Sequence, residues 1–251
     1  MTYPPKISVI TPSFNQGHFL EQTILSILNQ DYPNLEYIII DGGSNDQSIS
    51  IIERYATRLS FWVSEPDNGQ SHAINKGFQK ATGDIIGWIN SDDLLLPNTL
   101  NTIAKLFIDH NPAWITGDCI EINEHSVETG RYTTELPNTL YDWLNLFARG
   151  FSYSIIQPAT FWTREALDNV GLLNEKWHYS FDHEFFFRLF KHYGSPLYIN
   201  QPLAAFRIHS QSKTSTSAKI FMKENKAIAA HHISALSLNQ QLKLRLIKLL
   251  K

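Results

Sequence analysis

The first hundred residues alternate between short apolar runs and segments whose apolar residues recur at helical spacing. The apolar runs predict strands at residues 6–11, 35–40, 61–63 and 84–89. The helical spacing predicts helices between and after them, at residues 17–30, 46–55, 70–81 and 97–109. Because strands that alternate with helices form βαβ units, this pattern predicts an α/β fold with a parallel sheet.

The alternation loosens after residue 110. Strand-like runs at 114–122 and 130–133 can pair as a hairpin. The remaining elements are predicted as helices at 141–149 and 182–192 and as strands at 159–163 and 202–208. No repeat and no low-complexity linker separates the two parts. We therefore expect one domain over residues 1–215, followed by a helical extension at 216–251.

Polar and turn-forming residues follow each predicted strand of the first half. These strand ends read PSFN at 12–15, DGGS at 41–44, EPDNG at 65–69 and NSDD at 90–93. In open α/β sheets the ligand lies beyond the carboxyl ends of the strands, so these segments predict one ligand-binding edge. The two glycines of DGGS suit either a plain strand-to-helix turn or a close approach of the backbone to a ligand.

Two adjacent acids, Asp92 and Asp93, lie in the last of these strand ends. Capping a helix is the simplest role for such residues, but Pro97 favours a helix that begins several residues later. Mg²⁺ and Mn²⁺ bind through one or two carboxylates together with the phosphates of a substrate. A cation that binds a diphosphate is therefore the favoured interpretation of this acidic edge.

Composition excludes several classes of protein. The chain of 251 residues is 43% hydrophobic and carries a formal net charge of −3, so a basic surface for nucleic acid is not expected. Its single cysteine, Cys119, excludes an internal disulfide and a zinc site built from several thiolates. We identify neither a signal-peptide pattern nor an uncharged apolar stretch of transmembrane length, and we therefore expect a cytoplasmic location.

Three further features each have a structural and a functional interpretation. His72, Asn75 and Lys76 share a helical face that is either solvated or directed at an anion near the helix start. Asp182 heads an apolar helical stripe, either as a cap or as a general base beside a pocket. His209 follows a predicted strand and is structural unless the fold returns it to the acidic edge.

The ordered set of motifs resembles the family-2 glycosyltransferases of the GT-A fold. It consists of SVITPSFNQ, IIIDGGSNDQS, SEPDNGQSHAINKGFQKATGDIIGWINSDD, FDHEFFFRL and FRIH, and covers roughly residues 5–212. The resemblance implies a Rossmann-like three-layer α/β/α fold with a mostly parallel central sheet. Residues 1–110 would form a nucleotide-binding half and residues 110–215 an acceptor-binding half.

The resemblance also implies an activity. A sugar would pass from a nucleoside-diphosphate sugar, UDP-linked, to an acceptor hydroxyl with inversion, in the synthesis of surface polysaccharide or glycolipid. The implied cofactor is a divalent cation, Mn²⁺ or Mg²⁺. The implied acceptor is a glycan or a lipid-linked molecule.

Site residues follow from the matching motifs. The resemblance implies that the nucleotide sugar is bound by residues of the first three strand ends and of the helix that follows them, namely Thr11, Pro12, Phe14, Asp41, Gly69, Gln70, Ser71, His72, Asn75 and Lys76. It places Asn90 and Ser91 beside the sugar nucleotide as well.

The catalytic and metal-binding roles are implied in the same way. Asp92 matches the metal ligand of the DxD motif, whose first aspartate is replaced here by Asn90. His209 matches a histidine that completes the metal or diphosphate site. Asp182 matches the catalytic base of the "ED" motif, in which Phe181 replaces the glutamate.

The C-terminal stretch LKLRLIKLLK mixes leucines with basic residues. Such a helix either packs against protein, including a second subunit in a homodimer, or lies on the inner face of a membrane. We favour packing against protein. Two other functions stay open: a catalytically silent protein that binds a nucleotide sugar or glycan, and a sugar nucleotidyltransferase, although TPSFNQGH lacks the glycine-rich basic loop of the latter.

Overall fold

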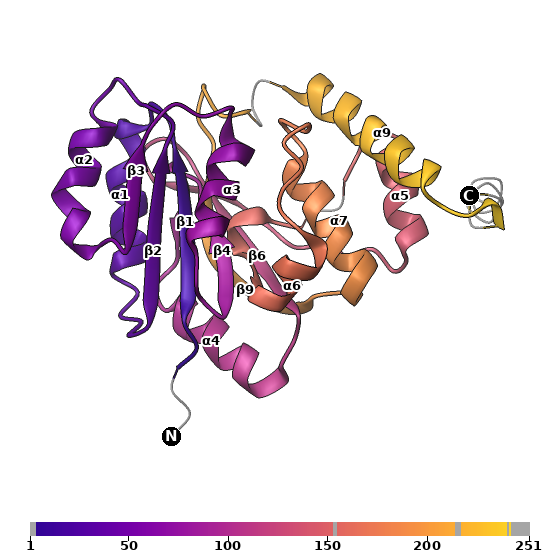
Figure 1. Ribbon diagram of the computed structural model, residues 1–251, viewed down its shortest axis with the longest axis horizontal. Coiled ribbons are helices and arrows are strands. Elements are labelled where there is room, and N and C mark those ends of the chain that lie inside the picture. Colours follow the sequence, from indigo (N-terminus) through magenta and orange to yellow (C-terminus); the bar gives the residue numbers. More distant parts are fainter. Residues whose placement is uncertain (1–3, 153–154, 214–216, 240, 242–251) are drawn as a thin grey trace.

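The computed structural model describes residues 4–152, 155–213, 217–239 and 241. In this part of the chain nine strands form one sheet in the order β3-β2-β1-β4-β8-β6-β9-β5, with β7 paired to β6 (Figure 1). The strands are β1 (Ile7–Ser13), β2 (Leu35–Asp41), β3 (Phe61–Ser64), β4 (Ile85–Trp88), β5 (Leu94–Leu95), β6 (Trp114–Ile122), β7 (Glu128–Tyr132), β8 (Thr160–Thr163) and β9 (Leu197–Arg207).

The N-terminal half of the sheet is parallel. Strand β1 pairs with β2 and β4, and β2 pairs with β3, all in parallel orientation. Strands β6 and β9 are also parallel, whereas β5, β7 and β8 run antiparallel to their neighbours. The predicted α/β fold with a mostly parallel central sheet is confirmed, and the predicted hairpin is β6 with β7. Because β1 to β4 are parallel, their carboxyl ends meet at one edge of the sheet.

Helices cover both faces of this sheet and give the predicted three layers. They are α1 (Gly17–Leu28), α2 (Ser48–Tyr55), α3 (Gln70–Lys80), α4 (Thr99–His110), α5 (Leu140–Ala148), α6 (Arg164–Val170), α7 (Phe181–Tyr193) and α9 (Ala218–Ser234), with short 3-10 turns η1 (Ala56–Arg58) and η2 (Gln157–Ala159). One buried apolar cluster joins the sheet to α3, α5, α6, α7 and α9, and the other joins it to α1, α2 and α4. In β2, Ile38 and Ile40 belong to the first cluster while Tyr37 and Ile39 belong to the second, as the two-residue period of a strand requires.

Two strands near the site differ from the prediction. Strand β5 was not expected, since two residues are too few to show a periodic pattern. Strand β9 begins at Leu197 instead of residue 202, and Pro202 lies inside it where the pairing with β6 shifts register at Asp118. Proline lacks the N–H that a regular ladder uses, so the bulge accommodates a residue that sequence reasoning placed at the strand start.

The helix after β5 begins slightly later than the pattern indicates. Asn98 precedes α4 with a left-handed φ of 65°, and the helix starts at Thr99. Pro97 therefore lies before the helix and not in its first turn. The conclusion that neither Asp92 nor Asp93 caps this helix is unaffected.

The described part of the predicted extension contains α9, which lies against α5 at the right of Figure 1. The basic, leucine-rich segment at 242–251 falls outside the described residues. Within the part of the chain that is described, no helix combines the length and the apolar character needed to cross a bilayer.

Candidate active site

The site centres on the loop that follows β4. The Asp92 Oδ2 atom in this loop lies 3.1 Å from Nε2 of His209, two residues beyond the end of β9. Pairing of β5 with Ala204 and Ala205 of β9 brings these two segments together. The fold therefore returns His209 to the acidic strand end, which is the condition under which the sequence indicated a functional role.

Arg207 fixes both segments. Its side chain is fully buried, and its Nε donates to the backbone oxygen of Asp92 at 2.8 Å. Its terminal nitrogens donate to the backbone of the β6–β7 turn at Asn123 and to Oε1 of Gln22 in α1. One guanidinium on β9 thus ties the loop after β4 to the β6–β7 turn and to α1, which limits how far the Asp92 carboxylate can move.

The pair of Asp92 and His209 suits a divalent cation. Two adjacent ligands of an octahedral ion with bonds of about 2.1 Å lie about 3 Å apart, close to the 3.1 Å observed here. No third His, Cys, Asp or Glu joins them among the described residues, so phosphates of a substrate would complete the coordination. The Nδ1 atom of His209 accepts the Gln211 N–H at 3.3 Å, which puts the proton of a neutral ring on Nε2. Metal binding at Nε2 would therefore require the ring proton to move to Nδ1, and the Gln211 N–H would then lose its acceptor.

Asp93 has a structural role. It is 1% exposed, and its oxygens accept the Arg207 backbone N–H at 3.0 Å and the Asn90 amide at 3.1 Å. Burial and the neighbouring charge of Asp92 hold the pKa of Asp93 well above its usual range, against the opposing effect of these two donors. Asp93 stabilises the loop from within, while Asp92 faces the site.

The Asn90 amide accounts for the departure from the DxD pattern. Its Nδ2 donates both to Asp93 and to Oε1 of Gln157, at 3.1 and 3.0 Å. Its Oδ1 accepts Nε2 of Gln70 at 2.8 Å. An ionised aspartate has no hydrogen to donate and would add a second charge beside Asp93. An amide therefore fits this position better than the carboxylate that the family motif usually has.

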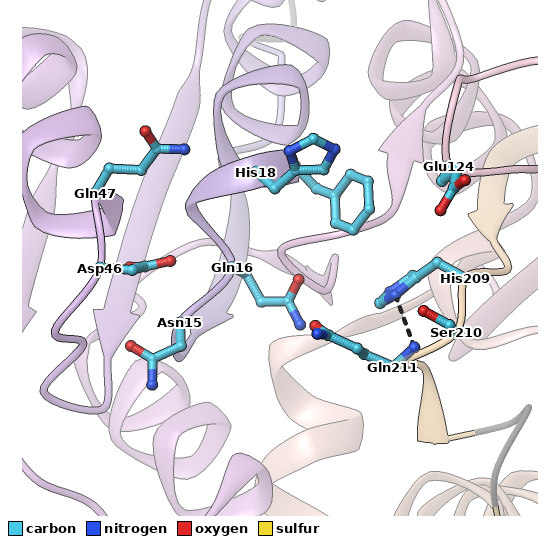
Figure 2. Close-up of a pocket in the computed structure, with 10 residues that line it drawn as sticks. Asn15, Gln16, His18, Asp46, Gln47, Glu124, His209, Ser210 and Gln211 are labelled. Atoms are coloured by element: carbon cyan, nitrogen blue, oxygen red, sulfur yellow. Dashed lines mark hydrogen bonds between the residues drawn. The ribbon is translucent and has the colours of Figure 1, made fainter.

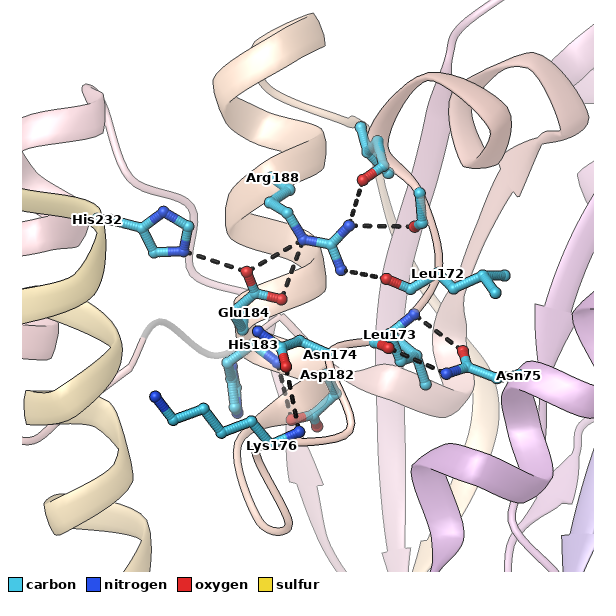
Figure 3. Close-up of polar contacts among 12 residues, drawn as sticks. Asn75, Leu172, Leu173, Asn174, Lys176, Asp182, His183, Glu184, Arg188 and His232 are labelled. Carbon is cyan, nitrogen blue, oxygen red and sulfur yellow. Dashed lines mark hydrogen bonds and ion pairs between the residues drawn. The ribbon is translucent and has the colours of Figure 1, made fainter. Parts of the chain in front are cut away.

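Asp182 occupies the first turn of α7, in the second half of the domain. It is half-buried, and its Oδ1 accepts the N–H of His183 at 2.8 Å. Ser180, not Asp182, is the N-cap residue of this helix, so the alternative that Asp182 is merely the cap is not favoured. Figure 3 shows Asp182 at the N-terminal end of α7, below Glu184 and Arg188 in the view.

Two acids hold α7 in place. The Glu224 carboxylate of α9 accepts the backbone N–H groups of His178, Tyr179 and Ser180 at 2.8–3.0 Å. One turn into α7, Glu184 is 2% exposed and binds both Arg188 and His232 (Figure 3). The desolvation of Glu184 raises its pKa, but the contacts with His232 and Arg188 outweigh it and leave the pKa below the usual range.

The residues predicted to bind the nucleobase fall into two groups. Phe14 is 59% exposed, so its ring is available to a ligand. Thr11 and Pro12 are buried in β1, and the Thr11 hydroxyl is 3.1 Å from the Tyr37 hydroxyl. Asp41 is fully buried and accepts four hydrogen bonds, from Gly43 N–H, from the Ser44 N–H and hydroxyl, and from the Ser64 hydroxyl. A direct contact between Asp41 and a base stays a prediction.

Residues in the N-terminal part of α3 that were predicted to bind the donor contact neighbouring protein groups, and their contact with a donor stays a prediction. Gly69 has a φ of 113° and precedes the helix, and Ser71 is buried within it. His72 Nδ1 accepts the N–H of Asn68, and Lys76 pairs with Glu65 at 2.8 Å.

Asn75 is committed to a neighbouring loop. It is 4% exposed, and its amide binds the backbone of Leu173 through both polar atoms (Figure 3). Its Nδ2 also donates to Glu175 at 2.9 Å. A donor contact by Asn75 stays a prediction that these bonds do not favour. Ser91 is likewise buried.

A cavity of about 430 Å³ lies beside His209, on the α1 side (Figure 2). It is lined by Asn15, Gln16, His18, Phe19, Asp46, Gln47, Glu124, His209, Ser210 and Gln211. Of the residues predicted for the site, only His209 lines this cavity. This cavity therefore adjoins the candidate site at His209.

Sequence reasoning missed Lys213, which lies between the two halves of the site. Its ammonium donates to Gln70 Oε1 at 2.9 Å and to the His178 backbone oxygen at 3.1 Å. Loss of solvent lowers the pKa of Lys213, while the charges of Asp182, Glu224 and Asp92 oppose that change. A lone lysine four residues after His209 carries no pattern that could have predicted this location.

Comparison with known proteins places the chain among glycosyltransferases. The family model described as Glycosyl transferase family 2 matches residues 8–171. An uncharacterized glycosyltransferase of Rickettsia typhi is 27% identical over 224 residues, which cover 86% of this chain and 68% of that protein. The putative teichuronic acid biosynthesis glycosyltransferase TuaG of Bacillus subtilis is 28% identical over 177 residues, covering 66% of this chain and 70% of that protein.

Solved structures share the fold at lower sequence identity. Staphylococcus aureus TarS 1-349 in complex with UDP-GlcNAc is 18% identical with a TM-score of 0.67, covering 84% of this chain and 61% of that chain. The mannosyltransferase PcManGT from Pyrobaculum calidifontis, in complex with GDP-Man and Mn²⁺, is 20% identical with a TM-score of 0.61. The match covers 99% of this chain and 81% of that chain. These likenesses concern the fold, and they confirm the GT-A type of α/β architecture.

Proposed function

The chain belongs to glycosyltransferase family 2, and on that premise we propose that it transfers a sugar from a UDP-linked donor to an acceptor hydroxyl with inversion. The observation that carries this proposal is the 3.1 Å pair of Asp92 and His209 at the carboxyl edge of the parallel strands. A bound Mn²⁺ or Mg²⁺ held by this pair would supply positive charge to the donor diphosphate. The proposed setting is the synthesis of surface polysaccharide or glycolipid, supported by the likeness to the teichuronic acid enzyme.

Asp182 is the proposed base. It would accept the proton of the acceptor hydroxyl while the oxygen of that hydroxyl attacks the anomeric carbon from the side opposite the diphosphate. Its location supports this role, because the Lys213 ammonium contacts the His178 carbonyl just before α7 and also Gln70, which in turn binds Asn90 in the loop that carries Asp92. These contacts support the proposal that the two carboxylates serve one site. Among the described residues, only one of the two Asp182 oxygens is engaged in a hydrogen bond, so the other remains available to an acceptor.

The test of the proposed function begins with donor binding. The full chain is titrated with UDP and GDP, with Mn²⁺ or Mg²⁺ and again after chelation, while thermal unfolding is followed. We expect a metal-dependent increase in the unfolding temperature with UDP, and an increase with GDP alone would overturn the UDP assignment. If neither nucleoside diphosphate stabilises the fold, the proposal is wrong.

Catalysis is then separated from binding. Nucleoside-diphosphate release from a panel of UDP- and GDP-sugars is measured for the wild type and for Asp182→Asn. A general base contributes about 10²- to 10⁴-fold to a rate, so the variant should bind the donor normally and transfer at least 100-fold more slowly. Binding without turnover in the wild type would favour a silent binding protein. Pyrophosphate release from a nucleoside triphosphate and a sugar phosphate would favour a nucleotidyltransferase.

A further inference from the structure

The ammonium of Lys213 lies where the donor half and the acceptor half of the site meet. We propose that Lys213 binds the diphosphate of the nucleotide-sugar donor and stabilises the charge that develops on the leaving nucleoside diphosphate. This inference rests on the proposed function. It adds to the divalent metal ion a second positive charge, which a side chain of the protein supplies.

The contacts of Lys213 define its location. The ammonium donates to Gln70 at the start of α3 and to the carbonyl of His178 just before α7, at 2.9 and 3.1 Å. The rings of Tyr179 and Phe181 lie with their centroids 5.4 and 5.8 Å from it. The Gln70 and His178 oxygens are neutral acceptors near the surface, so phosphate oxygens can replace these two without leaving a buried charge unpaired.

A hydrogen-bonded chain of amides connects Lys213 to the loop that follows β4. Gln157 anchors the chain on the backbone oxygen of Trp88, Asn90 donates to Gln157, Gln70 donates to Asn90, and Lys213 donates to Gln70. Each amide orients the next one, and the last oxygen in the chain accepts the ammonium. The lysine is thereby held next to the strand end that carries Asp92.

The reaction increases the negative charge on the diphosphate, and the lysine can stabilise that charge. The bond between the anomeric carbon and the β-phosphate oxygen breaks with its electron pair on that oxygen. The acceptor oxygen forms the new bond to carbon, and its proton goes to Asp182. The diphosphate thus gains one negative charge, and a fixed cation in contact with it stabilises the transition state more than the bound donor.

The charges of three carboxylates, Asp182, Glu224 and Asp92, raise the pKa of Lys213 and so oppose the lowering that desolvation causes. Lys213 as a residue is exposed, so a ligand can reach it from solvent. With Asn90 in place of an acid, this edge also holds one negative charge fewer to repel an incoming diphosphate.

Binding of nucleotides that differ by one phosphate tests the assignment. Dissociation constants of UDP and UMP, and of GDP and GMP, are measured calorimetrically for the full chain, for Lys213→Met and for Lys213→Arg. Loss of one charged hydrogen bond corresponds to about a 10- to 100-fold change in affinity. We expect Lys213→Met to lose that much affinity for the diphosphate and little for the monophosphate. Lys213→Arg should restore part of the difference.

Lys219→Met, on the exposed side of α9, is the matched control and should bind like the wild type. The proposal is overturned if Lys213→Met binds the diphosphate as tightly as the wild type does, or if it loses both nucleotides equally. If the wild type binds no nucleoside diphosphate at all, the proposed function itself fails.

Turnover adds a second readout. For the nucleotide sugar that the wild type uses, kcat of Lys213→Met should fall by more than KM rises, because the charge develops in the transition state. A rise in KM with unchanged kcat would contradict stabilisation of the leaving group.

Discussion

The imidazole of His209 lies 3.1 Å from the carboxylate of Asp92, although 117 positions separate them in the chain. This contact joins the end of β9 to the loop after β4. It converts two residues that are individually ambiguous into one candidate metal site.

Removal of either member should weaken metal-dependent nucleotide binding. Asp92→Ala and His209→Ala are each expected to lower the affinity for the nucleoside diphosphate in the presence of Mn²⁺ by about tenfold or more. After chelation of the metal, the difference from the wild type should shrink. Calorimetric titration with and without a chelator measures both. His125→Ala, with a side chain 78% exposed in the β6–β7 turn, is the control. Equal metal dependence in all four proteins would contradict the assignment.

Asn90→Asp, which restores the family motif, should destabilise this chain. The substitution removes two donated hydrogen bonds and places a second carboxylate beside the buried Asp93. We expect a loss of about 1–3 kcal/mol in the free energy of unfolding. Denaturant titration measures this loss.

The loss should increase with pH. The folded-state pKa of Asp93 is raised, so folding favours its protonated form and stability falls as pH rises through that pKa. A second acid at residue 90 strengthens this dependence. The double variant Asn90→Asp with Asp93→Asn again pairs an amide with a carboxylate and should recover part of the stability. No recovery would mean that repulsion is not the cause.

Glu224→Gln should slow transfer more than it weakens donor binding. Its carboxylate holds three backbone N–H groups immediately before α7, and Asp182 follows two residues after the last of them. A neutral amide keeps one acceptor oxygen, so we expect a stability loss of about 1–2 kcal/mol and a lower kcat. Rates with the donor at saturation, together with its dissociation constant, separate the two effects. Glu53→Gln, at an exposed residue of α2, is the control. If Glu224→Gln weakens donor binding as much as it lowers kcat, a positioning role is contradicted.

Phe14→Ala should weaken nucleotide binding without loss of stability. The ring is 59% exposed, so its removal leaves no cavity. Stacking of a base on an aromatic ring contributes about 1–3 kcal/mol, which corresponds to roughly a 5- to 150-fold weaker dissociation constant. Nucleoside diphosphate titration measures this effect. Val127→Ala, at a residue 57% exposed, is the comparison, and similar affinities in the two variants would remove Phe14 from the base site.

Glu36 should make the fold sensitive to acid. It is 7% exposed; burial raises its pKa, but hydrogen bonds from Lys6, Ser8 and Thr82 outweigh this and lower it from 4.5 to about 2. Because the folded-state pKa is depressed, the stabilisation is present above pH 4.5 and is lost as pH falls towards 2. Its size is on the order of 3 kcal/mol.

Urea unfolding of the wild type and of Glu36→Gln across this pH range tests the prediction. The variant should be less stable at pH 7 and should lose less stability on acidification. Glu128→Gln, in an exposed pair with Arg131, should differ little from the wild type at any pH. Parallel curves for the wild type and Glu36→Gln would show that Glu36 is not the acid-sensitive group.

Local patterns were sufficient for the first half of the fold. Each of β1 to β4 is a short apolar run, and helices with one apolar face separate the runs, so the sheet and its polar edge could be read without tertiary information. Asp92 and Asp182 were identifiable for the same reason, since each follows or begins an element whose pattern is clear. In the second half, the two-residue β5 and the proline inside β9 disrupt the periodic signal.

The tertiary structure decided which polar side chains face a ligand. It buries Asp93 and Asp41, directs Asn75 to the loop at Leu173, and brings His209 and Lys213 to the edge that Asp92 occupies. Residue type and spacing show which side chains can ionise or donate a hydrogen bond. They do not show which distant groups those side chains will bind. The partners depend on contacts between elements that the sheet brings together only in the folded chain.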